Sequence, residues 1–271
     1  MCEVNVKFDH LVHFTSNPKE TQAAFQKLGF NTIKGGNHTN WGTRNCLCYF
    51  HNLGYIEWIG FTDFEIAKTS DNILIQQIVN DSAFGEGFST MAFRTNDISA
   101  LQKELRQKDY ETIGPFDGNR IREDGSILSW SMLFLKEKSD DQVRYPFFIQ
   151  WGHADDIRKT EMKALWQHKN GEPSISYISF AVQNVQKTIL QYCRLFDIDQ
   201  NASRNGHDEF GDFTEIPISN ISIRLYRKAL ESSTLNGSNR PLCCGIAGVT
   251  DEKESTINVQ GAIYKIQKRH P

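Results

Sequence analysis

The chain has 271 residues, of which 39% are hydrophobic and 23% charged, and its formal net charge is −3. This composition indicates a soluble globular protein with room for two ordinary domains or one large one, and it gives no basic footprint for nucleic acid or for an anionic membrane surface. No apolar run is long enough to span a bilayer and the N-terminus shows no signal-peptide pattern, so we expect a cytoplasmic protein whose six cysteines are free thiols.

The first sixty residues predict a strand, a helix and three more strands. Asn17 and Pro18 favour a helix start, because Asn caps helices and Pro suits the first helical position, and Gly29 ends the helix. Apolar runs on either side of this helix predict strands at residues 5–15, 30–34, 44–51 and 54–61.

A second unit starts at GFSTMAFRTND and repeats this order. Phe93 corresponds to Phe14, and Asn96 precedes a helix predicted at residues 97–108, where Ile, Leu and Leu recur at helical spacing. Strands predicted at residues 110–114, 127–136 and 145–151 complete the unit.

A third start appears at SISYISFAVQNV, where Asn184 again precedes a predicted helix. Ile189, Leu190 and Cys193 recur at helical spacing and are expected to face inward. The strands predicted after this helix lie at residues 212–217, 220–227, 242–248 and 257–265.

Three approximate copies of one unit therefore organise the chain. Residues 154–172 are polar and charged and are expected to form a linker that can include one helical turn. We expect two units over residues 1–153, this linker, and a third βαβ-type unit over residues 173–271.

His10 in VKFDHLVHF and Glu57 in LGYIEWIGF are ionisable side chains inside apolar strands. Burying a charge in such a place is unfavourable unless a metal ion, a substrate or a hydrogen-bond partner uses it. Each residue can therefore be a metal ligand or a general base on a cavity wall, or a core residue with a structural partner.

Three segments carry a resemblance to a known family: FDHLVHF, then HTNWGTRNCLCYFHNLGYIEWI, then NRIREDGSILSWSMLF followed by PFFIQWG. They resemble the vicinal oxygen chelate superfamily and, within it, proteins with a glyoxalase-like domain. The resemblance covers about residues 5–153 and extends only loosely to the third unit. It implies an α+β fold in which repeated βαβββ units form a cupped mixed sheet around one cavity, with a third C-terminal unit.

The resemblance also implies metal ligands on the first and last strands of the units, where His10 and Glu57 stand. Superposing the two repeats puts Ser89 in the place of His10 and Gln150 in the place of Glu57. The expected ligands are thus His10, Glu57 and Gln150, with His10 and Glu57 also catalytic. Zn, Ni, Fe and Mn all suit such nitrogen and oxygen donors.

The residues expected to bind the substrate are His38, Asn45, Arg122, Trp130 and Gln150. His38 and Asn45 belong to H-x-x-x-G-T-x-N, in which Gly42 lets the backbone turn sharply. Arg122 alternates with Arg120, so both are expected on one strand face, where they could hold a carboxylate by bidentate hydrogen bonds. Turn formation, a solvated strand face and an ordinary core position are the alternative roles.

These features support three hypotheses. The first is a metal-dependent lyase, isomerase or dioxygenase that acts on a small oxygenated anionic molecule. The second is a metal-free protein of the small-molecule binding or resistance type that uses the same cavity, and the third is a non-catalytic partner-binding protein. We expect a homodimer.

Overall fold

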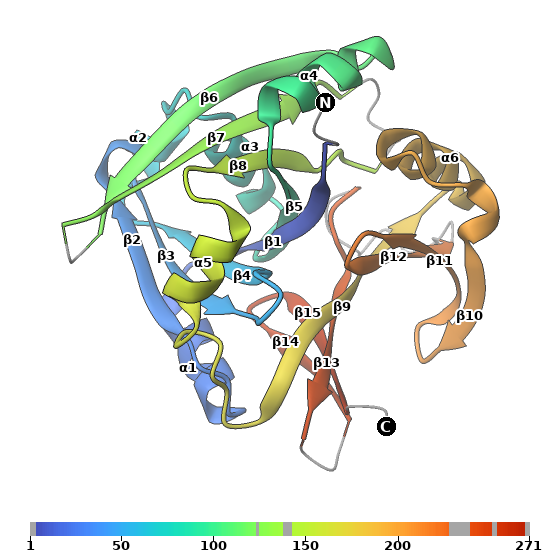
Figure 1. Cartoon of the computed structure of the whole chain (residues 1–271). Helices are drawn as coiled ribbons and strands as arrows, with labels where there is room; N and C mark the ends of the chain where they lie inside the picture. Colours follow the sequence, from blue (N-terminus) through green and yellow to red (C-terminus); the bar gives the residue numbers. More distant parts are fainter. Residues whose placement is uncertain (1–3, 123–124, 138–142, 228–238, 251–253, 269–271) are drawn as a thin grey trace.

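The computed structural model describes residues 4–122, 125–137, 143–227, 239–250 and 254–268, which form two mixed β-sheets with helices packed on and between them (Figure 1). The elements of the first unit are β1 (Val6–Phe14), α1 (Pro18–Lys27), β2 (Ile33–His38), the 3-10 turn η1 (Thr39–Trp41), β3 (Thr43–Tyr49) and β4 (Tyr55–Phe61). Two helices follow that the sequence pattern does not predict, α2 (Phe64–Lys68) and α3 (Ile73–Ser82).

The second unit repeats the order of the first. Its elements are β5 (Gly87–Thr95), α4 (Ile98–Gln107), β6 (Thr112–Ile121), β7 (Ile127–Leu135) and β8 (Phe147–Trp151). The helix predicted at residues 97–108 is present, with Asp97 as its N-cap, because the Asp97 carboxylate accepts a hydrogen bond from the N–H of Ala100. The expected hairpin joins β6 to β7, although Asp124 in its turn lies outside the described residues.

Both units share one eight-stranded sheet, sheet A, in the order β2-β3-β4-β1-β5-β8-β7-β6. The first strands of the units, β1 and β5, pair antiparallel at its centre, and each pairs parallel with the last strand of its own unit. The sheet curls into a cup, as the family resemblance implies (Figure 1). Its concave face carries the cavity described below.

The polar segment after β8 contains the helix α5 (Asp155–Met162). Met162 and Leu165 pack against Tyr49 and Tyr55 on the concave face of sheet A. This segment therefore covers part of the cup.

The rest of the chain forms a second sheet, sheet B. Its elements are β9 (Gly171–Val182), α6 (Val185–Phe196), the 3-10 turn η2 (Gln200–Ala202), β10 (Arg204–Asp208), β11 (Gly211–Ile218), β12 (Ile221–Arg227), β13 (Cys243–Val249), β14 (Ser255–Val259) and β15 (Ala262–Lys268). The strand order β10-β11-β12-β9-β13-β15-β14 matches that of sheet A without a partner for β6. Sheet B thus repeats the layout of sheet A, beginning with a βαβββ unit of its own.

Three sequence expectations for this region need correction. The single strand expected over residues 257–265 is a hairpin, because Gln260 and Gly261 both adopt positive φ angles and turn the chain between β14 and β15. Leu190 is 44% exposed and does not face the core, whereas Ile189 and Cys193 do. Strand β10 is polar throughout, so no apolar run marks it in the sequence.

One apolar cluster joins the outer faces of the two sheets. It includes Phe25 of α1, Leu101 of α4 and Tyr192 of α6 together with residues of both sheets. Fully burying one such side chain contributes about 1.5–3 kcal/mol.

A polar link crosses the same joint between the sheets. His13 Nε2–H donates to the carbonyl oxygen of Gln260 at 3.0 Å, so its Nδ1 accepts from the Tyr264 hydroxyl at 2.8 Å. Trp58 Nε1–H donates to the same hydroxyl at 3.2 Å. Burial lowers the pKa of His13 to about 4, so this link requires a neutral imidazole.

Among the described residues, no helix has the length and the apolar character that crossing a membrane requires.

Candidate functional site

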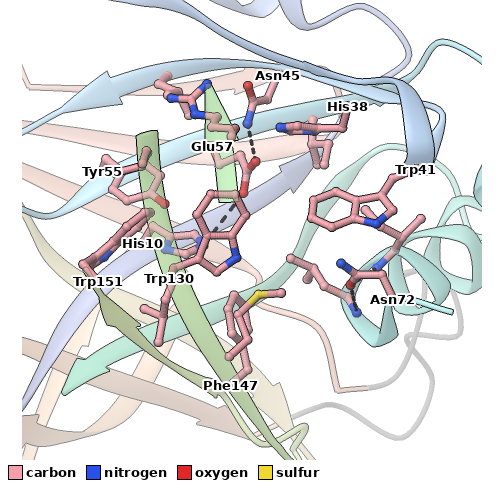
Figure 2. A pocket seen from close by; sticks show the side chains of 18 of the residues that line it. His10, His38, Trp41, Asn45, Tyr55, Glu57, Asn72, Trp130, Phe147 and Trp151 are labelled. Atoms are coloured by element: carbon pink, nitrogen blue, oxygen red, sulfur yellow. Dashed lines mark hydrogen bonds and ion pairs between the residues drawn. The ribbon is translucent and has the colours of Figure 1, made fainter. Parts of the chain in front are cut away.

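The concave face of sheet A holds a cavity of about 670 Å³, counted with its open mouth. Strands of both units line it, and α3 contributes Leu74 and Ile75 to its wall. The imidazole, amide and charged side chains of its lining are His10, His38, Asn45, Glu57, Asn72 and Arg120. Figure 2 labels all of these except Arg120.

Strand alternation decides which residues face the cavity. Successive side chains of a strand point to opposite faces of the sheet. Glu57 therefore faces the cavity between Tyr55 and Ile59, while the intervening Ile56 and Trp58 pack into the outer core. The same alternation brings Asn45 of β3 and Trp130 of β7 to the cavity.

A bulge in β1 brings Asp9 and His10 together. Phe8 pairs with Phe93 and His10 with Ala92, so Asp9 is an extra residue without a partner on β5. Neighbouring side chains would otherwise point to opposite faces. Here His10 Nδ1 lies 2.7 Å from Asp9 Oδ1, and because an ionised carboxylate only accepts, Nδ1–H is the donor. His10 Nε2 is then the ring nitrogen available to the cavity.

The Asp9 carboxylate is completely buried and held ionised by its neighbours. Burial alone would raise its pKa, but the hydrogen bond from His10 and the positive charges of Arg158 and Arg94 outweigh burial and lower the pKa below its ordinary value. Trp151 Nε1–H donates to Asp9 Oδ2 at 3.0 Å, and Arg158 Nη1 lies 3.6 Å from the same oxygen. Arg158 also stacks over the Trp151 ring at 4.6 Å. Asp9 is therefore a fixed anion behind His10.

Glu57 is oriented by Asn45 and a bulge in β2. Asn45 Oδ1 accepts from the N–H of Gly36 at 2.6 Å, so its Nδ2 donates to Glu57 Oε1 at 2.5 Å. A Cβ at Gly35 would lie 2.0 Å from Asn45 Oδ1, so this arrangement needs glycine there. Glu57 Oε2 keeps its hydrogen-bonding capacity and faces His10.

His10 Nε2 and Glu57 Oε2 are 3.8 Å apart on the cavity wall, as Figure 2 shows. Both residues are buried, with 3% and 8% exposure. The separation is too long for a direct hydrogen bond, and an atom of a ligand in the cavity could lie within hydrogen-bond distance of both. His10 also stacks on Tyr55, with ring centroids 4.4 Å apart, which holds the imidazole plane.

His10 and Glu57 are the donors closest to forming a metal site. Two bonds of about 2.1 Å could bridge His10 and Glu57. A protein zinc site nevertheless takes at least three protein ligands, and the described part of the chain has no cluster of three His, Cys, Asp or Glu side chains that could hold an ion. The corresponding strands of the second unit face the cavity with Ala92, Phe147 and Ile149. The residues present do not complete a metal site.

The structure places His38 on the same side of the cavity. Its Nδ1 lies 3.0 Å from the Thr43 hydroxyl, and its ring contacts Trp41 at 5.5 Å between centroids. Burial lowers the pKa of His38, Arg120 lowers it further and Glu57 opposes both. The expected turn at Gly42 is present, with φ of 59°.

The two arginines of the β6–β7 hairpin separate, although the sequence pattern places them on one face. Arg122 follows the last residue of β6 and pairs with Glu161 Oε2 of α5 at 3.2 Å, outside the cavity lining. Arg120 lines the cavity instead and reaches over to β2, where its Nη1 would lie 3.0 Å from a Cβ at Gly36. The hairpin end breaks the alternation that joins the two residues in the sequence.

Gln150 is also not brought to the cavity. In β8 the side chains of Phe147, Ile149 and Trp151 face inward, so Gln150 points to the opposite face. There its Oε1 accepts from the N–H of Ile98 at 2.8 Å. In the strand pairing Glu57 lies opposite Val12, and Phe147 lies opposite the corresponding Ala92. The superposition of repeats that equates Gln150 with Glu57 is therefore displaced and puts Gln150 on the wrong face.

Ser89, equated with His10, is likewise absent from the lining. Its hydroxyl donates to Asp81 at 2.5 Å, and Asp81 in turn binds Arg144 through both carboxylate oxygens. Ser89 is part of a buried structural cluster.

Several contributors to the site have no clear sequence signal. Asp9 is visible beside His10, but only the bulge turns its carboxylate toward the imidazole. Arg158 lies in the polar segment expected as a linker, and α3 lies in a region without a predicted element. Trp41 shows only as an aromatic residue before Gly42. For Arg120 the sequence signal is strand alternation, which places it on the same face as Arg122.

A family model described as a glyoxalase-like domain matches residues 8–196 of the chain. No curated protein matches the chain. This match covers sheet A, α5 and the start of sheet B.

Solved structures agree with this fold. A hypothetical protein from Staphylococcus aureus superposes with a TM-score of 0.80 at 24% identity, over 97% of this chain and 100% of that one. A catechol 2,3-dioxygenase gives 0.53 at 8% identity, over 98% of this chain and 93% of that one. A 4-hydroxymandelate synthase variant from Streptomyces coelicolor gives 0.52 at 9% identity, over 89% of this chain and 71% of that one. At these identities the likeness concerns the fold.

Proposed function

The chain belongs to the glyoxalase-like domain family, and from that premise we propose that it is an enzyme that moves a proton on a small oxygenated anionic molecule. His10 and Glu57 are the proposed acid–base pair. The reaction class is that of an isomerase, in which a proton leaves a carbon beside a carbonyl group and returns to the same or another atom.

One observation carries this proposal: His10 Nε2 and Glu57 Oε2 face each other at 3.8 Å inside a cavity, and neither atom has a hydrogen-bond partner among the described residues. A carboxylate and an imidazole next to one bound molecule are a common arrangement for general acid–base catalysis. The surrounding protein fixes both groups, since Asp9 orients His10 and Asn45 orients Glu57.

The proposed step uses only these side chains. Glu57 Oε2 takes the proton from the carbon, and the electron pair of the broken C–H bond moves onto the substrate oxygen. His10 Nε2–H, in the protonated imidazole, donates a hydrogen bond or its proton to that oxygen. Asp9 stabilises the positive charge of the imidazolium through Nδ1–H. The reverse transfer to carbon completes an isomerisation.

A second candidate is a metal-free binding protein that uses the same cavity. It is favoured by the lining, in which aromatic and aliphatic side chains outnumber polar ones, and by the donor set, which is too small for a metal ion. It differs from the enzyme in one testable way: His10 and Glu57 would then support affinity and no turnover.

Hydrogen exchange distinguishes the two candidates. The protein is incubated in D₂O with a panel of 2-oxo carboxylates, and proton NMR follows the loss of the signal from the carbon beside the 2-oxo group. We expect at least one acid to exchange faster than in buffer, and Glu57→Gln to slow this exchange by about 10²–10⁴-fold.

Two results would contradict the enzyme. Exchange in the panel at the buffer rate would favour the binding protein, and so would an unchanged rate in Glu57→Gln. Arg122→Gln is the matched control, because Arg122 lies outside the cavity and should leave the rate within twofold of the wild type.

A further inference from the structure

The cavity is divided into a polar side and an apolar side. Its titratable groups come from the first unit, with His10, His38, Tyr49, Tyr55 and Glu57, and from the hairpin residue Arg120. On the other side stand Met132 and the aromatic ring of Phe147, together with the leucine and isoleucine of α3. A ligand that satisfies both sides must itself have a polar end and an apolar body.

Arg120 is the cation on the polar side. Within the described part of the chain, no carboxylate lies within 4.0 Å of its guanidinium, whereas the neighbouring Arg122 is paired with Glu161. Arg120 does affect its surroundings, because its charge lowers the pKa of His38 and opposes the rise in that of Tyr49. A guanidinium without a protein carboxylate at a cavity wall suits a carboxylate of a ligand, which it can hold by two parallel hydrogen bonds.

Three indole rings surround the remaining space, as Figure 2 shows for Trp41, Trp130 and Trp151. Trp130 and Trp151 meet edge to face, with centroids 6.0 Å apart and planes at 62°. Trp151 also has Arg158 over its ring, and Trp41 contacts the His38 ring. Both Trp41 and Trp130 nevertheless remain partly exposed in the lining. Partly exposed indoles in a cavity wall favour a flat ring system as the occupant.

We propose that the ligand of this cavity is an aromatic carboxylate, with its carboxylate on Arg120 and its flat ring between the indoles of Trp41 and Trp130. This inference rests on the proposed function and names the substrate class of the same site. It assigns recognition to Arg120 and to the tryptophans, and it leaves the proton transfer to His10 and Glu57.

Calorimetric titration of the whole protein with three matched probes tests the proposal. The probes are 2-naphthoate, the neutral 2-naphthamide and the saturated decahydro-2-naphthoate. We expect the wild type to bind 2-naphthoate at least tenfold more tightly than either of the other two, since one lacks the charge and the other lacks the flat ring.

Variants then assign the charge. Arg120→Gln should weaken 2-naphthoate at least tenfold and leave 2-naphthamide unchanged, and Arg120→Lys should lose part of the affinity because it keeps the charge without the planar fork. Arg122→Gln, two residues away, should bind all three probes as the wild type does. Melting curves confirm that each variant is folded, and the comparison of probes on the wild type stands even where a variant is not.

Three outcomes would overturn the inference: no saturable binding of 2-naphthoate at millimolar concentration, equal affinity for 2-naphthoate and 2-naphthamide, or equal affinity for the flat and the saturated acid. Failure of the proposed function looks different. In that case the wild type catalyses no proton exchange, and Glu57→Gln binds 2-naphthoate at least as tightly as the wild type. This pair of results would support the ligand class and contradict the acid–base role.

Discussion

The two sheets place different residues at the same positions of one layout. His10 of β1 and Tyr177 of β9 stand at the same distance along the chain from the helix that follows, and each strand pairs parallel with the last strand of its unit. In that pairing Glu57 lies opposite the second residue after His10, and Arg224 lies opposite the second residue after Tyr177. Sheet A thus has a His and Glu pair where sheet B has a Tyr and Arg pair.

The pair in sheet B is satisfied by its own neighbours. The guanidinium of Arg224 lies 3.7 Å from the centre of the Tyr177 ring and 4.4 Å from that of Phe213. Its Nε–H donates to Glu215 Oε2 at 2.6 Å, and its Nη1 lies 3.5 Å from Asp208 Oδ2. Burial lowers the pKa of Arg224, but Glu215 outweighs burial and raises it above its ordinary value.

The two sheets differ in whether the protein itself supplies partners for the pair. In sheet B the guanidinium of Arg224 has carboxylates and aromatic rings of the protein as partners, so the cluster needs no ligand. In sheet A, Asp9 and Asn45 fix the orientation of His10 and Glu57 but leave one atom of each facing an open cavity. Polar atoms that are both fixed and unpartnered are ready for a ligand, because binding requires no reorganisation.

Separate substitutions of Glu57 in sheet A and Arg224 in sheet B test this comparison most strongly. Glu57→Gln should slow proton exchange by about 10²–10⁴-fold while changing the free energy of unfolding little, since an amide can still accept from Asn45. Arg224→Met should do the opposite, lowering the free energy of unfolding by about 2 kcal/mol and leaving the exchange rate unchanged. NMR exchange rates and urea unfolding measure both quantities; a rate loss in Arg224→Met would break the comparison.

The anion behind His10 should matter for both stability and rate. Asp9→Asn leaves the buried Arg158 with only the half-exposed Asp155 as a charge partner, so we expect the free energy of unfolding to fall by about 3 kcal/mol. An amide can also donate to Nδ1, which would favour the wrong imidazole tautomer and slow exchange at least tenfold. Nitrogen-15 NMR of the His10 ring reports the tautomer directly. A wild-type tautomer and rate in the folded variant would rule out the positioning role.

Acid should weaken the joint between the sheets at His13. Burial lowers its pKa in the folded protein to about 4 from an ordinary 6.5. The unfolded chain therefore binds a proton below pH 6.5 while the folded chain does not, so the free energy of unfolding falls between pH 6.5 and 4, by about 3 kcal/mol in all, and His13 has no effect above that range.

Urea unfolding at pH 7.5 and pH 5 measures this loss. His13→Gln should flatten the dependence in part, because His168, whose pKa burial also lowers to about 4, acts in the same direction. If the free energy of unfolding of a folded His13→Gln variant falls as steeply with pH as that of the wild type, the acid sensitivity does not come from His13.

Removal of metal should have the smallest effect. The donor atoms of sheet A are two where an ion needs at least three from the protein. We expect protein dialysed against EDTA to keep its exchange rate within twofold, and added Zn²⁺, Ni²⁺, Fe²⁺ or Mn²⁺ to restore nothing. A tenfold loss that one of these ions reverses would show that a ligand or water completes the site.

Much of the fold was predictable because it depends on local pattern. The alternation around Glu57 and the capping residues Asp97 and Asn184 mark their strands and helices in the sequence. The elements that were not predicted lack such a pattern. The polar β10 shows no apolar run, and α2 and α3 lie between the first and second units, in a segment without a counterpart in the other units.

The candidate site was predictable only where strand alternation is regular. His10, His38, Asn45, Glu57 and Trp130 are all brought to one cavity. The superposition of repeats failed for Gln150 because a shift by an odd number of residues moves a side chain to the other face of a sheet, and alternation failed for Arg122 because the strand ends before it.

The sequence by itself determined that this protein is built from repeated βαβββ units and that a His and a Glu stand on apolar strands of the first one. Periodicity and capping act over a few residues, so they can be read without the rest of the chain. Only the tertiary structure decided which groups surround that pair. The bulge that turns Asp9 to His10, the helix that brings Arg158 to Asp9 and the hairpin that brings Arg120 over β2 each join residues far apart in the chain or depend on a partner strand. Such contacts are set by packing, which no local pattern encodes.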